Sequence, residues 1–172
     1  MGDYAKRVIA LTGRLKPSEG LLVTNIKNIR YLTRFTGSNG YVFVSAEGAY
    51  FMTDFRYEEQ AREEVDGAFD IIILKKNLIA LLGRLIKKTK IKTLLVESSV
   101  SYEAYKRLSV FDLRVVSGAV EKLRVRKDAE EIALIEEAVR RAEGAFLDVR
   151  PHIKMGAKET SIVLRLEERL RR

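Results

Sequence analysis

The fold is decided by residues 25–61, which read NIKNIRYLTRFTGSNGYVFVSAEGAYFMTDFRYEEQA. At the centre of this stretch, two apolar segments at residues 41–45 and 49–53 are separated by a short connection that ends in Gly48. Aromatic and β-branched residues on both sides of a tight, glycine-containing connection are typical of a β-hairpin. Both segments are apolar at almost every position, as strands buried on both faces are. We therefore expect a sheet that is covered by helices on both sides.

Polar segments flank the predicted hairpin. Residues 36–40, Thr-Gly-Ser-Asn-Gly, form a turn cluster in which Gly37 and Gly40 can supply positive φ angles. After the hairpin, Asp54 can cap a helix that opens at Phe55, with acidic residues in its first turns. The hairpin is thus expected between a turn and a capped helix.

The rest of the first two thirds of the chain alternates between strand and helix patterns. Strands are expected at residues 20–24, 69–74, 93–96 and 113–116, and helices at 3–15, 25–34, 54–65, 77–88 and 101–108. This alternation, together with one hairpin, predicts an α/β fold in which a mixed β-sheet is flanked by helices.

The composition shifts after Ser117, and a C-terminal helical pair is expected. Asp128 with Glu131 approximates a capping box for a helix over residues 128–149. After breaks at Pro151 and Gly156, a second helix is expected over residues 159–171. We assign residues 1–124 to one domain and 125–172 to the start of another. The apolar stripes of the two helices should be buried against the first domain, each other or a partner chain.

Two motifs in residues 25–61 resemble the N-terminal domain of the Xaa-Pro aminopeptidases and Xaa-Pro dipeptidases, the creatinase-like family. They are N-I-x-Y-L-x-x-F-T-G-S-N-G and T-D-x-R-Y-x-x-Q-A. Here they comprise Asn28, Ile29, Tyr31, Leu32, 35–40, Thr53, Asp54, Arg56, Tyr57, Gln60 and Ala61. The family commonly has Gly at the position of Arg34, so the arginine argues against a positive-φ turn there. The resemblance implies a mixed sheet flanked by helices, in agreement with the residue patterns.

A second resemblance covers the C-terminal part of the chain. The pattern L-R-x-x-K-D-x-x-E-I at residues 123–132 is similar to the entry into the family's catalytic "pita-bread" domain. The connector K-P-G-M-T-E of the family appears at residues 154–159 with Gly156 and Glu159 retained, but without its Pro and Thr. The resemblance implies a chain truncated soon after the catalytic domain begins.

The family resemblance implies hydrolysis of Xaa-Pro bonds by two divalent metal ions, such as Mn, Co or Zn. The metals are held by two Asp, one His and two Glu and make a bridging water nucleophilic. In the family all five ligands follow the connector helices, so we assign no catalytic residue, metal ligand or cofactor to this chain. We expect the chain to be inactive by itself.

The residues offer no other enzymatic site. His152 is the only histidine, Asp148 is the only carboxylate near it before Glu159, and no cysteine is present. No G-x-S-x-G motif supports a serine nucleophile. The segment 37–40 lacks the lysine and spacing of a phosphate-binding loop. We interpret His152 as a loop residue.

The candidate site residues are Arg56, Tyr57 and Asn39. The resemblance implies that the T-D-x-R-Y segment lies near a subunit interface and helps to shape the active-site mouth of a neighbouring subunit. An arginine fork suits a carboxylate or backbone carbonyl of a peptide. Alternatively, Arg56 pairs within the chain with Asp54 or Glu59. Both interpretations stay open for all three residues.

Net charge and hydropathy limit the classes of partner that the chain can have. The formal net charge is +8, but the basic residues are scattered, which indicates solvated faces more than a nucleic-acid footprint. No run of 18 apolar residues predicts a membrane span, and the N-terminus lacks a signal core, which favours the cytoplasm.

We expect a homo-oligomer, a dimer, with the catalytic domain and a proline-containing peptide as partners of the full-length enzyme. Two alternatives remain: a scaffold assembling through its C-terminal helices, and a basic nucleic-acid-binding module.

Overall fold

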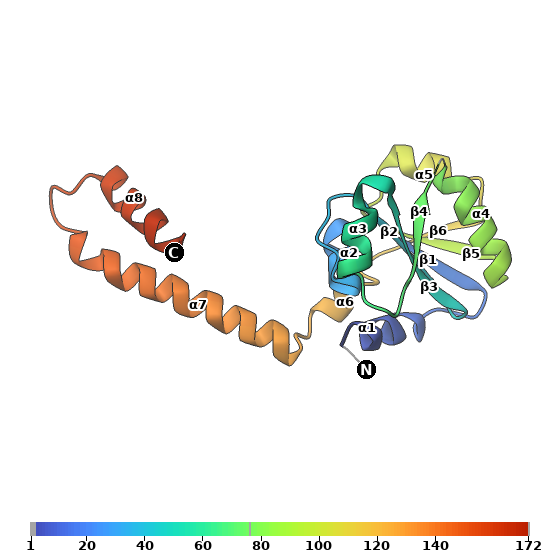
Figure 1. Cartoon of the computed structure of the whole chain (residues 1–172), viewed down its shortest axis with the longest axis horizontal. Coiled ribbons are helices and arrows are strands. Elements are labelled where there is room, and N and C mark those ends of the chain that lie inside the picture. The colour runs from blue at the N-terminus through green and yellow to red at the C-terminus, as the bar shows by residue number, and fades with distance from the viewer. Residues whose placement is uncertain (1–2, 76, 172) are drawn as a thin grey trace. The chain divides into compact units, whose positions relative to one another are not determined.

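A computed structural model describes residues 3–75 and 77–171 of the chain (Figure 1). The chain divides into two compact units, Met1–Arg126 and Lys127–Arg172. The larger unit contains all the strands among the described residues, and the smaller unit is helical.

The larger unit is built on a six-stranded mixed sheet with the order β4-β3-β2-β1-β5-β6. Its strands are β1 (Glu19–Val23), β2 (Tyr41–Ser45), β3 (Gly48–Asp54), β4 (Asp70–Leu74), β5 (Thr93–Glu97) and β6 (Leu113–Val116). Strand β2 is antiparallel to β1 and β3, and the remaining pairs are parallel. The predicted hairpin is confirmed as β2 and β3, in which Ser45 pairs with Gly48. The predicted α/β class with a mixed sheet is also confirmed.

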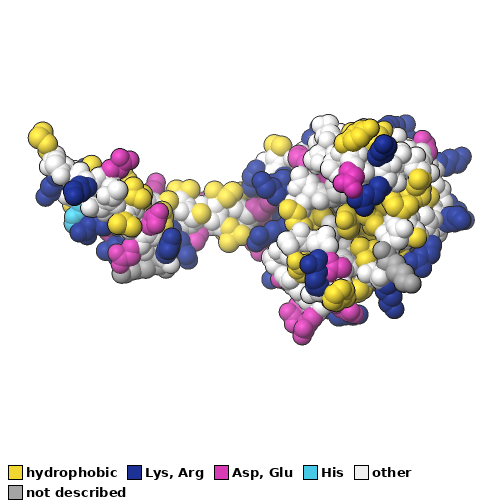
Figure 2. All heavy atoms as spheres, turned by 90° about the horizontal axis from the view of Figure 1, so that it is seen from above, with side chains coloured by type: hydrophobic (Ala, Val, Ile, Leu, Met, Phe, Trp, Pro, Cys, Tyr) yellow, Lys and Arg dark blue, Asp and Glu magenta, His cyan; other side chains and the backbone are white. Residues whose placement is uncertain are grey.

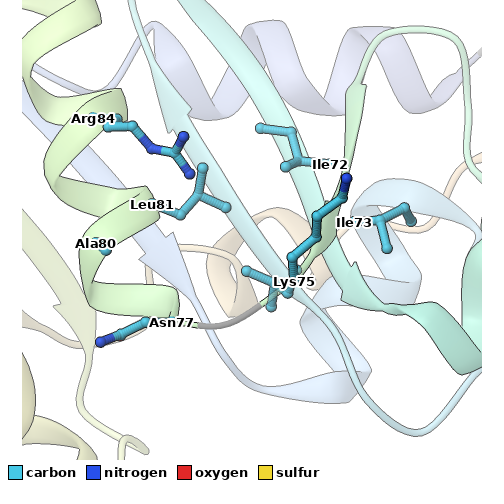
Figure 3. A pocket seen from close by; sticks show the side chains of 8 residues that line it. Ile72, Ile73, Lys75, Asn77, Ala80, Leu81 and Arg84 are labelled. Atoms are coloured by element: carbon cyan, nitrogen blue, oxygen red, sulfur yellow. The ribbon is translucent and has the colours of Figure 1, made fainter.

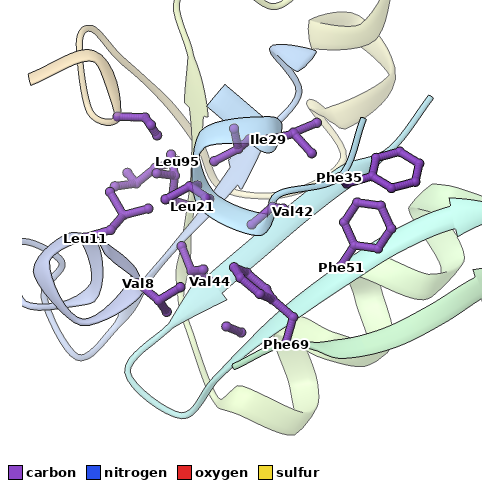
Figure 4. Close-up of a cluster of buried hydrophobic side chains, with 14 of the residues drawn as sticks. Val8, Leu11, Leu21, Ile29, Phe35, Val42, Val44, Phe51, Phe69 and Leu95 are labelled. Atoms are coloured by element: carbon purple, nitrogen blue, oxygen red, sulfur yellow. The ribbon is translucent and has the colours of Figure 1, made fainter. Parts of the chain in front are cut away.

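Helices cover both faces of the sheet (Figure 1). One face packs against α1 (Asp3–Thr12), α2 (Ile26–Thr33), α3 (Glu58–Glu64) and α6 (Glu121–Arg124). The other packs against α4 (Leu78–Thr89) and α5 (Tyr102–Leu108). In β2, Val42 and Val44 enter the first core, drawn in Figure 4, and Phe43 enters the second. This is why the strand sequences are apolar without alternation: successive side chains point to opposite faces, and both faces are buried.

Two predictions about backbone conformation are wrong. Arg34 adopts φ +73° at the end of α2, and its N–H donates to the carbonyl of Arg30 at 2.9 Å. Gly37 and Gly40 do not have positive φ. Their need for glycine is steric, since a Cβ at Gly37 would lie 2.2 Å from Cζ of Phe35, and one at Gly40 would lie 3.0 Å from Cε2 of Phe51.

The smaller unit consists of α7 (Ala129–Val149), a 3-10 turn at Arg150–His152, and α8 (Glu159–Leu170). The predicted capping box is confirmed: Glu131 N–H donates to Asp128 Oδ1 at 2.9 Å, and Asp128 N–H donates to Glu131 Oε2 at 3.1 Å. The two helices pack on each other, with Ala145 and Val149 of α7 buried. Most of the predicted apolar stripe of α7 is nevertheless half-exposed: Ile132, Ile135, Val139 and Phe146.

Candidate functional site

The candidate site is centred on Asp54, the last residue of β3. Its Oδ1 accepts the N–H of Arg56 at 3.1 Å, which caps a 3-10 turn over Phe55–Tyr57. The same carboxylate pairs with the Arg56 guanidinium through two bonds, from Nε to Oδ1 and from Nη2 to Oδ2, both at 2.9 Å. Nδ2 of Asn39 donates to Oδ2 at 2.6 Å. Asp54 therefore gathers two of the three predicted site residues.

The third predicted residue, Tyr57, joins the same cluster through packing. Its hydroxyl lies 2.7 Å from Oγ of Ser38, and its ring stands edge-on to the buried ring of Phe35 at 5.7 Å between centroids. The Arg56 guanidinium lies 5.5 Å from the Tyr57 ring centroid. Asn39 is anchored by its carbonyl, which accepts the hydroxyl of Thr53 at 2.6 Å. We refer to Asn39, Asp54, Arg56 and Tyr57 as the Asp54 cluster.

Electrostatics keep Asp54 and Arg56 ionised. The hydrogen bonds from the Arg56 side chain, followed by that from Asn39, hold the pKa of Asp54 well below its usual range. The hydrogen bond to Asp54 in turn raises the pKa of Arg56. The Arg56 side chain is 62% exposed and that of Asp54 19%. A pair this exposed contributes little to stability, so its clearest effect is to orient the guanidinium.

An exposed aromatic residue lies next to this oriented arginine. Phe55 is 76% exposed, although large apolar side chains are usually buried. Phe55 is not among the site residues predicted from the sequence, because the motif T-D-x-R-Y leaves its position variable. An aromatic ring beside an arginine whose fork is held in place is a combination that protein interfaces favour. The arrangement is suited to contacting another chain or a peptide.

A second polar cluster was also missed from the sequence. Glu97, at the end of β5, is buried and accepts the N–H groups of Thr24 at 2.7 Å and Asn25 at 2.8 Å. Nδ2 of the fully buried Asn28 donates to Glu97 Oε1 and to Glu121 Oε1, each at 2.6 Å. The bond from Asn28 lowers the pKa of Glu121. All these groups are occupied with one another, so we interpret the cluster as structural.

The described residues do not supply a metal centre. Across residues 3–75 and 77–171, no three His, Cys, Asp or Glu side chains come together in a way that could hold an ion. His152 lies exposed in the 3-10 turn after α7. The metals that the family resemblance implies therefore have no ligand set among these described residues. None of the described helices is long and apolar enough to span a membrane.

Comparison with known proteins identifies the family. The model of the Creatinase/Prolidase N-terminal domain matches residues 6–126. An uncharacterised peptidase of Bacillus subtilis, YqhT, is 39% identical over 154 residues, which cover 87% of this chain and 43% of the relative. The chain spans about half the length of the curated relatives that it matches, 43% and 47%.

Solved structures share the fold. The Xaa-Pro dipeptidase from Bacillus anthracis matches with a TM-score of 0.85 and 30% identity, over 98% of this chain and 48% of that protein. The X-Pro aminopeptidase from Thermotoga maritima matches with a TM-score of 0.80 and 30% identity, over 96% and 48% of the two chains. From the match over residues 6–126 and the mixed sheet that carries the Asp54 cluster, we conclude that this chain belongs to the creatinase/prolidase N-terminal domain family.

Proposed function

We propose that this chain is the non-catalytic N-terminal domain of an Xaa-Pro aminopeptidase- or dipeptidase-like metallopeptidase. In this proposal, residues 1–124 form the domain and residues 125–172 are the first helices of the catalytic domain. The N-terminal domain contributes dimerisation and helps to control access to an active site built by the rest of the enzyme. The names of the similar proteins from Bacillus anthracis and Thermotoga maritima support the reaction class.

The observation that carries the proposal is the exposed pair Phe55 and Arg56 at the end of β3. Asp54 and Asn39 hold the arginine in one orientation while most of its side chain stays in solvent. Because these bonds already order the guanidinium, a partner that binds its remaining N–H groups loses less side-chain entropy than it would with a free arginine. Phe55 adds apolar area that becomes buried on association. These features suit an interface with a second copy of the chain.

Sedimentation velocity over a range of concentrations tests the dimerisation role. We expect the unchanged chain to dimerise and Phe55→Asp to weaken the association constant by about tenfold or more, as for loss of an interface anchor. Tyr102→Asp is the matched control, since Tyr102 is a similarly exposed aromatic residue on α5, 77% against 76%. A clean monomer, or equal weakening by both variants, would remove this interface from the proposal.

The exposed stripe of α7 favours a second candidate, a scaffold that assembles through its C-terminal helices. Ile135 and Val139 are 49% and 50% exposed on the same helix. The double variant Ile135→Asp, Val139→Asp separates the two candidates in the same experiment. Association that collapses in this double variant but survives Phe55→Asp would support the scaffold role. The reverse pattern supports the Phe55–Arg56 interface.

A further inference from the structure

Strand β4 forms an open edge of the sheet. Among the strands that the structure describes, β4 pairs only with β3, and its sequence contains three consecutive isoleucines, Ile71, Ile72 and Ile73. The three side chains are half-buried, and no backbone hydrogen bond on the outer side of β4 is present among the described residues. Natural sheets usually protect an edge with proline, an inward charge or a bulge. Strand β4 begins with the exposed Asp70, but residues 71–74 carry no proline or charge, so this part of the edge is apolar and can pair with another strand.

A hollow of about 550 Å³ lies beside this edge, between β4 and α4 (Figure 3). Its apolar lining includes Ile72, Leu74 and Leu81. Figure 2 shows hydrophobic side chains gathered in a hollow on one face of the larger unit, with both basic and acidic side chains around it. The hollow is therefore large enough, and apolar enough, to take a side chain from another molecule.

Two cations face the hollow. Lys75 follows β4 and Arg84 lies on α4, and both line the hollow in Figure 3, whereas none of the described residues that line it is a carboxylate. Both side chains are exposed, and within residues 3–75 and 77–171 neither forms an ion pair or a side-chain hydrogen bond. The hollow thus combines an apolar lining with uncompensated positive charge.

We propose that this edge and hollow bind an extended peptide segment that carries carboxylates. The backbone of the segment continues the sheet beyond β4, an apolar side chain enters the hollow, and a carboxylate lies near Lys75 and Arg84. This is recognition by strand addition, in which backbone bonds supply affinity and alternate side chains supply specificity. A symmetric second copy fits less well, since it would bring the same cations of another chain with formal charge +8 to the interface. The proposal does not depend on dimerisation through Phe55 and Arg56.

The test uses a synthetic peptide of about eight residues in the repeating pattern Val-Thr-Glu-Thr, so that valine and glutamate lie on the same face of the strand, with both ends blocked. A matched peptide carries glutamine in place of each glutamate, and another carries lysine. Fluorescence anisotropy at low salt should show binding of the acidic peptide to the intact chain, and weaker or no binding of the other two. Increasing the salt concentration should weaken binding, because exposed charges are screened.

Single charge reversals locate the site. Lys75→Glu and Arg84→Glu should each weaken binding of the acidic peptide by about two- to fivefold, the range of an exposed ion pair. Lys92→Glu is the matched control, because Lys92 is an exposed lysine beside β5, away from β4 in the strand order. Since all three side chains are exposed, loss of folding is not expected to obscure the comparison.

Hydrogen exchange tests the pairing itself. Outward-facing amides of residues 71–74 should exchange more slowly with the acidic peptide bound, and those of β6 at the other edge of the sheet should not change. The proposal is overturned if the three peptides bind equally or if Lys92→Glu weakens binding as much as Arg84→Glu. It is also overturned if binding leaves the amides of residues 71–74 unprotected.

Discussion

Arg34 and Gly37 lie three residues apart, and in both cases tertiary packing decides the role of the residue. Arg34 takes a left-handed angle that costs an L-residue about 1 kcal/mol, because α2 ends there and the chain must turn to bury Phe35. Gly37 takes an ordinary angle but leaves room for the rings of Phe35 and Tyr57. A glycine in a turn motif can therefore be required for space and not for φ.

At this scale we predict that Gly37→Ala destabilises the larger unit by about 1–3 kcal/mol, because the new Cβ would overlap Phe35. Gly67→Ala is the control, since nothing lies within 4 Å of its added Cβ, and its effect should be below about 1 kcal/mol. Urea unfolding followed by tyrosine fluorescence measures both, and all 7 tyrosines precede residue 127. Equal stability of the two variants would show that the Phe35 ring moves aside without cost.

At the scale of elements, the Asn28 and Glu97 cluster ties together segments that are distant in sequence. Glu97 at the end of β5 holds the loop that leads into α2, and Asn28 on α2 connects Glu97 to Glu121 and Arg124 on α6. Helix α6 is only four residues long, so it cannot be stable by itself. The cluster helps to fix the last helix of the larger unit against α2.

We predict that Asn28→Ala destabilises the larger unit by about 1–3 kcal/mol, because it leaves Oε1 of the buried Glu97 without this donor. Lys27→Ala, at an exposed position of the same helix, should change the free energy of unfolding by less than about 0.5 kcal/mol. Urea unfolding followed by tyrosine fluorescence measures the free energy of unfolding of both variants. If Asn28→Ala lowers the free energy of unfolding no more than Lys27→Ala does, a water molecule has replaced the side-chain amide of Asn28 as the donor to Glu97.

For the whole molecule, the shifted carboxylates predict a loss of stability in acid. The pKa is lowered for Glu19 by the Lys16 N–H, for Asp54 by Arg56 and for Glu121 by Asn28. For Glu64, burial raises the pKa, but hydrogen bonds from Gln60 and Thr36 outweigh it and the net shift is downward. Groups whose pKa is lower in the folded state stabilise the protein above their unfolded values of about 4, and this contribution is lost as the pH falls through the folded values.

We therefore expect the melting temperature to be nearly constant between about pH 7 and pH 5.5 and to fall steadily below about pH 4.5. Circular dichroism melts at a series of pH values measure this. Glu121→Gln should lower the melting temperature at neutral pH and flatten its acid dependence, because the variant lacks one of the titrating groups. A melting temperature that rises toward pH 4 would contradict the sign of these shifts.

For the chain as a whole, most of the fold could be predicted from the hydrophobic pattern, the turn residues and the capping residues. The hairpin, the alternation of strands with helices and the capping box at Asp128 and Glu131 were predicted because each depends on residues close together in sequence. The motif also named Asn39, Arg56 and Tyr57 as site residues. Pairing of Arg56 with Asp54 was one of the two interpretations of that arginine, but the bond from Asn39 to the same carboxylate was not predicted, because Asn39 lies in another segment of the chain.

The features that the tertiary structure alone decided depend on residues far apart in the chain. The strand order places β4 at an edge, and only this position leaves its isoleucines and the hollow near Lys75 and Arg84 open to a partner. Glu97 meets Asn28 across 69 residues, and nothing local to either marks the pair. Sequence periodicity predicted which strand residues of the larger unit are buried, because those strands are apolar at almost every position, whereas most of the apolar stripe predicted for α7 is half-exposed. Which residues touch was decided by the packing of the whole sheet with its helices.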